Sequence, residues 1–222
     1  MIRQSQSRHQ HRRFEEERKN VVKVHILGGP GSGKTTLAQC ISSRFHVPHY
    51  NLDKVNFKQV NEVDIAEQPA WVTEGIYLIF TEAMLYHADY IVVLTAPWPV
   101  LAQRMIRRHV LNSLRGTQDY PGLNGIKALI KLIKDTRSYC LNQCDKEIPS
   151  AKSLHEYIEL HTEIADPPSK EFVSTYVSTY GELIIPPSAQ FVAEYLERYK
   201  EKVIFINNRA DRERLFELFM KK

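Results

Sequence analysis

The chain has little cysteine and no long apolar segment. Only three of its 222 residues are cysteines, Cys40, Cys140 and Cys144, and this small, odd number argues against a disulfide framework. Cys140 and Cys144 are four residues apart, but nothing nearby completes a Cys/His metal set, so we expect buried thiols. No apolar run reaches the length of a membrane span, and the N-terminus lacks the apolar core of a signal peptide.

Net charge is also small. The chain has 30 Lys and Arg against 26 Asp and Glu, a formal charge of +4, and the basic residues are spread along it. This charge gives no reason to expect a nucleic-acid partner, and the lack of a membrane span and of a signal peptide favours a cytoplasmic protein with no membrane partner. We expect a monomer or a homodimer. Residues 1–20, rich in Gln, Ser, His and Arg, predict a flexible basic arm. A nucleic-acid contact by this arm is the alternative to a solvated tail.

One segment points directly to chemistry. Residues 28–35 read Gly-Gly-Pro-Gly-Ser-Gly-Lys-Thr, which is the phosphate-binding pattern G-x-x-x-x-G-K-T, or P-loop. A β-branched run at 21–27 precedes it, and apolar residues at helical spacing follow it at 37, 41 and 45. Strand, glycine loop and helix are the context that this motif requires. The chain is therefore expected to bind ATP or another nucleoside triphosphate together with Mg²⁺.

Each position of the loop has an expected role. Its glycines permit unusual backbone angles and let successive N–H groups face one anionic cavity, to which the following helix adds its positive end. Lys34 would contact the β- and γ-phosphates, the Thr35 hydroxyl would bind Mg²⁺, and Thr36 would lie near the α-phosphate. The predicted nucleotide-binding residues of the loop are Gly28, Gly29, Pro30, Gly31, Ser32, Gly33, Lys34, Thr35 and Thr36.

Strands alternate with helices along the rest of the chain, which predicts an α/β domain over 21–222 with a parallel sheet covered on both faces. We expect residues 112–125 to form a loop and residues 54–68 a loop or short helix over the site. Residues 146–187 form an insertion with a helix near 152–163. Strands are expected at 21–27, 48–52, 70–73, 90–94 and 203–206, and further helices at 33–45, 76–87, 100–111, 126–144, 188–200 and 211–220.

Ligands bind at the carboxyl ends of the strands in such sheets, and two acidic residues follow strands there. Asp53 is the candidate to orient the acceptor and serve as general base. Glu74 is the candidate for the Mg²⁺ shell, directly or through water, or for acceptor binding, and Gly75 lets the chain turn close to the phosphates. The alternatives are a helix cap or surface acid for Asp53 and a dipole-favoured acid at a helix start for Glu74.

Phosphoryl transfer also needs cations around the moving group. Arg104 and Arg108 are four residues apart on one helix face, and Arg115 follows in the expected loop, which suggests a mobile lid at about 111–125. A solvated basic face is the alternative. Arg209 follows the fifth strand, where it would stack on the nucleobase or lie on the surface.

Other P-loop classes match less well. A GTPase would show an Asn-Lys-x-Asp motif, and residues 207–211 are a poor match to it. An ordinary ATPase would end its most apolar strand with an acid, but this strand ends at Thr95. Two carboxylates at two strand ends are better suited to phosphoryl transfer to a bound acceptor.

The order of motifs resembles the adenylate-kinase-like P-loop kinases, and more narrowly the bacterial topology modulation protein (FlaR-related) group. The resemblance implies a three-layer P-loop NTPase fold, a five-stranded parallel sheet of order 2-3-1-4-5 and a lid after strand 4. It also implies that Gly28 to Thr36 hold ATP and Mg²⁺, that Asp53 contacts the acceptor, and that Arg104 and Arg108 lie on the lid side. It rests on residues 26–38, 50–53, 71–77 and 88–94.

The expected function is transfer of the γ-phosphoryl group of ATP to a nucleotide or another small-molecule acceptor. This chain has Glu74 where the group usually has Asp, and it has Thr95 and Pro97-Trp98 where the group often has Asp and then Pro-Arg. The departures at Thr95 and Trp98 motivate one alternative, an ATP-binding regulatory protein with little turnover. The basic arm motivates the other, a nucleic-acid-associated ATPase.

Overall fold

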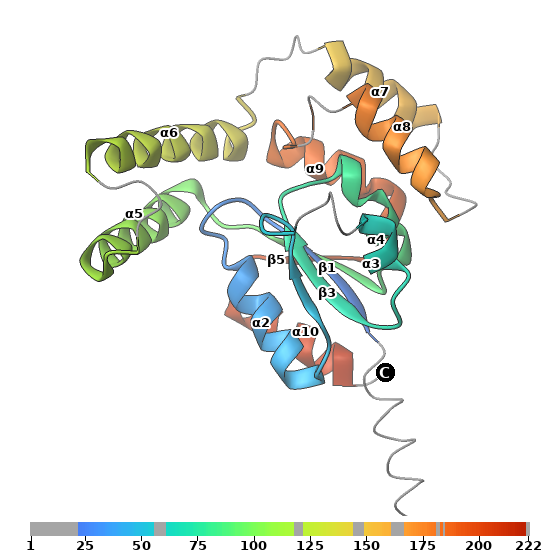
Figure 1. The fold of residues 1–222 in the computed structure, drawn as a ribbon, viewed down its shortest axis with the longest axis horizontal. Helices are drawn as coiled ribbons and strands as arrows, with labels where there is room; N and C mark the ends of the chain where they lie inside the picture. The colour runs from blue at the N-terminus through green and yellow to red at the C-terminus, as the bar shows by residue number, and fades with distance from the viewer. Residues whose placement is uncertain are drawn as a thin grey trace, which may run out of the picture.

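The computed structural model describes residues 22–55, 61–117, 122–143, 149–160, 167–180, 183 and 185–220. Five strands form one parallel sheet in the order β2-β3-β1-β4-β5 (Figure 1). The α/β fold and the predicted strand order are therefore confirmed. The strands are β1 (Lys23–Leu27), β2 (His49–Asn51), β3 (Trp71–Gly75), β4 (Tyr90–Leu94) and β5 (Val203–Ile206).

Helices cover both faces of the sheet. On one face, α2 (Lys34–Phe45) and α10 (Arg209–Met220) pack on the side chains of Val24 and Ile26. The opposite face buries Leu27 and the tryptophan of β3, Trp71. It is covered by α3 (Glu62–Ala66), the 3-10 helix η1 (Ile79–Thr81), α4 (Glu82–His87) and α9 (Ala189–Leu196), which the 3-10 helix η3 (Glu197–Tyr199) continues.

The two helices after β4 have other bounds than the sequence predicted: α5 is longer, and α6 begins and ends earlier. Helix α5 spans Trp98–Arg115 and α6 spans Leu123–Cys140, so residues 112–115 and 123–125 are helical and the prediction of a loop there is wrong. The reason is the position of the helix-ending residue: Gly116 has a φ of 66°, and its N–H bonds back to the carbonyls of Asn112 and Ser113. The predicted helix at 126–144 ends earlier, and Cys144 lies outside the described residues.

The insertion that the sequence left unassigned contributes two helices to the fold. Helix α7 (Pro149–Leu160) matches the helix expected near 152–163, and α8 (Lys170–Tyr180) follows it. Leu154, Val173 and Tyr176 are buried in the same core cluster as Trp71, so these helices extend the layer on that face of the sheet. The N-terminal arm of residues 1–20 lies outside the described residues. Among the described residues, no helix is long and apolar enough to cross a membrane.

A buried histidine in β1 makes the stability of the fold depend on pH. The His25 side chain is fully buried, with its Nδ1 2.7 Å from Thr73 Oγ1, and burial lowers its pKa from 6.5 to about 3. As the pH falls from 6.5 towards 3, the unfolded chain binds a proton that the folded chain does not bind. The contribution of His25 to the free energy of unfolding is therefore fully present above pH 6.5. It falls by about 1.4 kcal/mol per pH unit below that value.

We expect His25→Gln to reduce this pH dependence, because glutamine does not titrate. The measurement is the free energy of urea unfolding at several pH values between 4 and 7. His46→Asn, at an exposed left-handed position, is the matched control and should keep the wild-type slope. Equal slopes for both variants would contradict the assignment.

Candidate functional site

The P-loop has the backbone that an anion cradle requires. Gly31 and Gly33 have φ angles of 77° and 94°, which side chains other than glycine rarely adopt. Gly33 precedes α2 without a side-chain cap, so the first N–H groups of the helix remain open to a ligand. A Cβ atom at Gly28 would lie 2.6 Å from Ser32 Oγ. The loop therefore has room for backbone alone and can face a phosphate chain.

Glu74 meets the P-loop from the end of β3. Its side chain is fully buried, and its Oε1 accepts a 2.9 Å hydrogen bond from the Thr35 hydroxyl. Lys34 Nζ is 3.9 Å from Oε2, which has no hydrogen-bond partner among the described residues. His49 Nε2 lies 3.9 Å from Oε1, and burial lowers the pKa of this histidine. The structure thus brings Lys34, Thr35 and Glu74 together, with a neutral imidazole beside them.

These groups fit Mg²⁺. Magnesium in phosphate-transfer sites is held by one or two protein oxygens and completes its shell with phosphate oxygens and water. The Thr35 hydroxyl and the Glu74 carboxylate supply such oxygens, and Oε2 of Glu74 is a buried acceptor with no hydrogen-bond donor in the described part of the chain. Within the described residues no cluster of three or more His, Cys, Asp or Glu could hold a metal alone. The site therefore suits a metal that arrives with a nucleotide.

Asp53 lies on the neighbouring strand end. It follows β2, is exposed, and donates its backbone N–H to Asn51 Oδ1 at 3.0 Å. Tyr77 hydrogen-bonds to the Asp53 carboxylate, and burial, followed by this bond and by the charges of Asp53 and Glu74, raises the pKa of Tyr77 to about 12. The phenol therefore stays protonated and donates. Sequence reasoning assigned Tyr77 no role, although it stands two residues after Gly75.

Gly75 is required by close packing at the same place. A Cβ atom there would lie 2.9 Å from Tyr77 Cδ2 and 3.3 Å from the Leu52 side chain. The absence of a side chain lets Tyr77 reach Asp53 across the end of β3. Gly75 also accepts a backbone hydrogen bond from Gly28, at 3.3 Å, which ties the P-loop to this edge of the sheet.

The predicted arginines of α5 take different places. Arg104 Nη1 lies 3.2 Å from the Gly31 carbonyl and 3.4 Å from the Ser32 carbonyl, so its guanidinium is at the P-loop. Arg108 is exposed one turn further along. Arg115 is in the last turn, about 16 Å beyond Arg104 along the helix axis, and the structure does not bring it to the loop.

On α10, the arginine that lies nearest to the P-loop is not the one that the sequence predicted. The Arg209 side chain is 92% exposed, and its Nε pairs with Glu213 Oε1 at 3.0 Å. Arg212 was not predicted, yet its Nη2 lies 3.8 Å from the position of a Cβ atom at Gly33. The three-residue spacing of Arg209 and Arg212 on one helix is the only feature of the sequence that could have indicated it.

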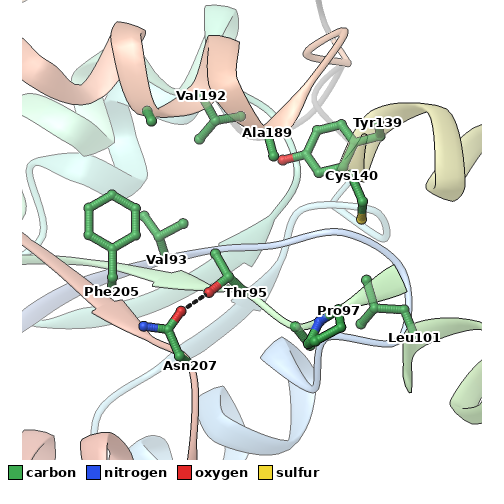
Figure 2. A pocket seen from close by; sticks show the side chains of 12 residues that line it. Val93, Thr95, Pro97, Leu101, Tyr139, Cys140, Ala189, Val192, Phe205 and Asn207 are labelled. Carbon is green, nitrogen blue, oxygen red and sulfur yellow. Dashed lines mark hydrogen bonds between the residues drawn. The ribbon is translucent and has the colours of Figure 1, made fainter. Parts of the chain in front are cut away.

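A cavity of about 480 Å³ opens at the carboxyl ends of β4 and β5 (Figure 2). Thr95 donates a hydrogen bond to Asn207 Oδ1 at its base. Tyr139 connects the cavity to the P-loop, because its Cε1 is 3.8 Å from the position of a Cβ atom at Gly29. The volume is in the range of small-ligand pockets. Its lining includes Val93, Cys140, Val192 and Phe205.

Comparison with known proteins identifies no family. No family model matches the chain, and no curated protein matches it. Among solved structures, a shikimate kinase from Acinetobacter baumannii in complex with shikimate is 18% identical, with a TM-score of 0.34, over 54% of this chain and 78% of that chain. A shikimate kinase from Bacteroides thetaiotaomicron is 16% identical, with a TM-score of 0.33, over 73% and 97%. Likeness this low says nothing of activity.

Proposed function

We propose that the protein is a Mg²⁺-dependent phosphotransferase of the adenylate-kinase-like class, which transfers the γ-phosphoryl group of ATP to a small acceptor. The observation that supports this best is the hydrogen bond from Thr35 to the buried Glu74 at 2.9 Å. It joins the P-loop to a carboxylate, while Asp53 follows the adjacent strand. One acid therefore belongs to the donor half of the site, and the other remains for an acceptor.

The donor half consists of the P-loop with Lys34, Thr35, Thr36 and Arg104. Lys34 neutralises charge on the β- and γ-phosphates, and Arg104, already at the loop carbonyls, adds charge from the lid side. Thr36 is exposed beside Thr35 and faces the α-phosphate in this proposal. Bound Mg²⁺, held by Thr35 and Glu74, would supply further neutralisation of the phosphate charge.

The base and ribose of the nucleotide are assigned to the cavity beside the P-loop. Phe205 offers an aromatic face, and Asn207 has an amide nitrogen that is not used by its bond to Thr95. An aromatic surface with one amide is a common way to hold a base by stacking and an edge contact. Tyr139 lines this cavity and also lies 3.8 Å from the position of a Cβ atom at Gly29, so the cavity adjoins the P-loop.

The acceptor half centres on Asp53 and Tyr77. In the transfer, the acceptor oxygen bonds to the γ-phosphorus while the bond from that phosphorus to the β–γ bridging oxygen breaks, leaving ADP. The proton of the acceptor hydroxyl passes to the Asp53 carboxylate. Tyr77, hydrogen-bonded to Asp53, orients the carboxylate towards the acceptor.

The test is acceptor-dependent ADP release over a panel of small alcohols and nucleotides, followed by Asp53→Asn. We expect this substitution to lower kcat about a hundredfold or more and to leave ATP affinity unchanged, because Asp53 does not touch the P-loop. Asp135→Asn, on the exposed surface of α6, is the matched control. ATP binding without ADP release for any acceptor would instead support a regulatory protein with little turnover.

A further inference from the structure

Helices α5 and α6 form a hairpin that exposes much of the apolar surface of the protein. Figure 1 shows the two helices side by side, extending away from the sheet. Although they make up only 36 of 222 residues, they contain seven of the thirteen exposed large hydrophobic residues in the described chain. These seven are Ile106, Val110, Leu111, Leu114, Leu123, Ile126 and Ile130.

The exposed residues are arranged in stripes. Ile106, Val110 and Leu114 follow one another every four residues, on the side of α5 away from Leu101 and Met105, which are buried. On α6, Leu123 begins a similar series with Ile126 and Ile130. Leu114 is 80% exposed and Leu123 is 75% exposed, and they occupy the ends of the two helices that face the connection. The most exposed apolar side chains are thus at the tip of the hairpin.

The same helices are strongly basic. Helix α5 has four arginines and no acid, and α6 has three lysines, one arginine and one aspartate, so the two helices together have a net charge of 8 − 1 = +7. The whole chain has a net charge of +4, which leaves 4 − 7 = −3 for the rest. A second copy of this chain would place +7 against +7, whereas an anionic surface would be attracted.

We propose that the α5–α6 hairpin docks on an anionic lipid membrane surface. Exposed leucines flanked by basic residues are the features with which amphipathic helices enter the boundary between headgroups and acyl chains. Leu114 and Leu123 would insert there, while Arg115, Lys127 and Lys131 would contact lipid phosphates. A nucleic acid would bind the basic residues, but it has no apolar region in which the exposed leucines would be buried. The observations therefore favour lipid. Contact with a membrane surface needs no membrane-spanning helix. The expectation of no membrane partner was based on the lack of such a helix.

The proposal is tested with the full chain and two kinds of vesicle, one of phosphatidylcholine and one that also contains phosphatidylserine. We expect co-sedimentation with the anionic vesicles only, weakening as salt is raised. Leu114→Glu and Leu123→Glu should each reduce the partition coefficient about tenfold or more. Leu218→Glu is the control, because Leu218 is 42% exposed on α10, and it should bind as the wild type does.

Other outcomes would overturn the proposal. These are binding to neutral vesicles alone, no binding to either kind, or equal binding by the leucine variants and the wild type. Loss of a dimer in Leu114→Glu, seen by sedimentation velocity without any vesicle binding, would assign the surface to a second copy. Tighter binding to duplex DNA than to anionic vesicles, lost in Lys127→Glu and Lys131→Glu, would assign it to nucleic acid. Circular dichroism of each variant checks that the fold is retained.

Discussion

Lys34→Ala should lower phosphoryl transfer about a hundredfold to a thousandfold and weaken ATP binding, while the fold is retained. The Lys34 side chain is 13% exposed, with its Nζ 3.9 Å from Glu74 Oε2, so its charge faces the space between the P-loop and the buried carboxylate. Phosphates of a bound nucleotide would occupy that space. Without the lysine, the γ-phosphate would meet Glu74 with less neutralising charge between them.

The comparison that isolates this effect uses ATP and inorganic tripolyphosphate as ligands in calorimetry. Lys34→Ala should weaken both by a similar factor, because both present the same phosphates. Phe205→Ala should weaken ATP by about fivefold, equivalent to about 1 kcal/mol of base stacking, and leave tripolyphosphate unaffected. Lys131→Ala, at an exposed position of α6, should change neither. Wild-type affinity for both ligands in Lys34→Ala would exclude the P-loop as the phosphate site.

The strands at the centre of the sheet, β1 and β4, were predictable because they are local apolar runs. Tyr90–Leu94 and Lys23–Leu27 are largely buried, so each reads as a near-continuous hydrophobic segment. The P-loop was predictable for a similar reason, since its chemistry lies within eight consecutive residues. The strand order, in contrast, came from the resemblance to a family, because it depends on crossovers that no short segment encodes.

The arrangement of the cations and of the acceptor half could not be derived in this way. Arg104, Arg115 and Arg212 look alike in sequence, and only the path of α5 and α10 decides which of them approaches the P-loop. Tyr77 reaches Asp53 because Gly75 permits close packing between two strand ends. Such contacts join residues that are distant in the chain, so they follow from tertiary structure alone.

A buried polar cluster between α4, α9 and η3 also could not be predicted from the sequence. Glu82 is 1% exposed, yet it accepts hydrogen bonds from Arg198 and from the hydroxyls of Tyr195 and Tyr199, the last at 2.8 Å. Burial, and then the charge of Glu82, raises the pKa of both tyrosines, so both hydroxyls stay protonated as donors. The carboxylate therefore joins α4 to α9 and η3 through bonds that span more than a hundred residues.

Arg198→Ala should destabilise the protein by about 3–5 kcal/mol, because it leaves the Glu82 carboxylate buried without its cation. The Arg198 side chain is 4% exposed, and its guanidinium also lies 5.4 Å from each of the Tyr195 and Tyr199 ring centroids. Arg209→Ala removes an ion pair whose arginine is 92% exposed, so urea unfolding should show a loss below about 1 kcal/mol. The double variant Glu82→Leu, Arg198→Met should lose less than Arg198→Ala, since it removes both charges and keeps apolar volume. Equal losses for Arg198→Ala and Arg209→Ala would show that the buried charge pair does not hold these helices together.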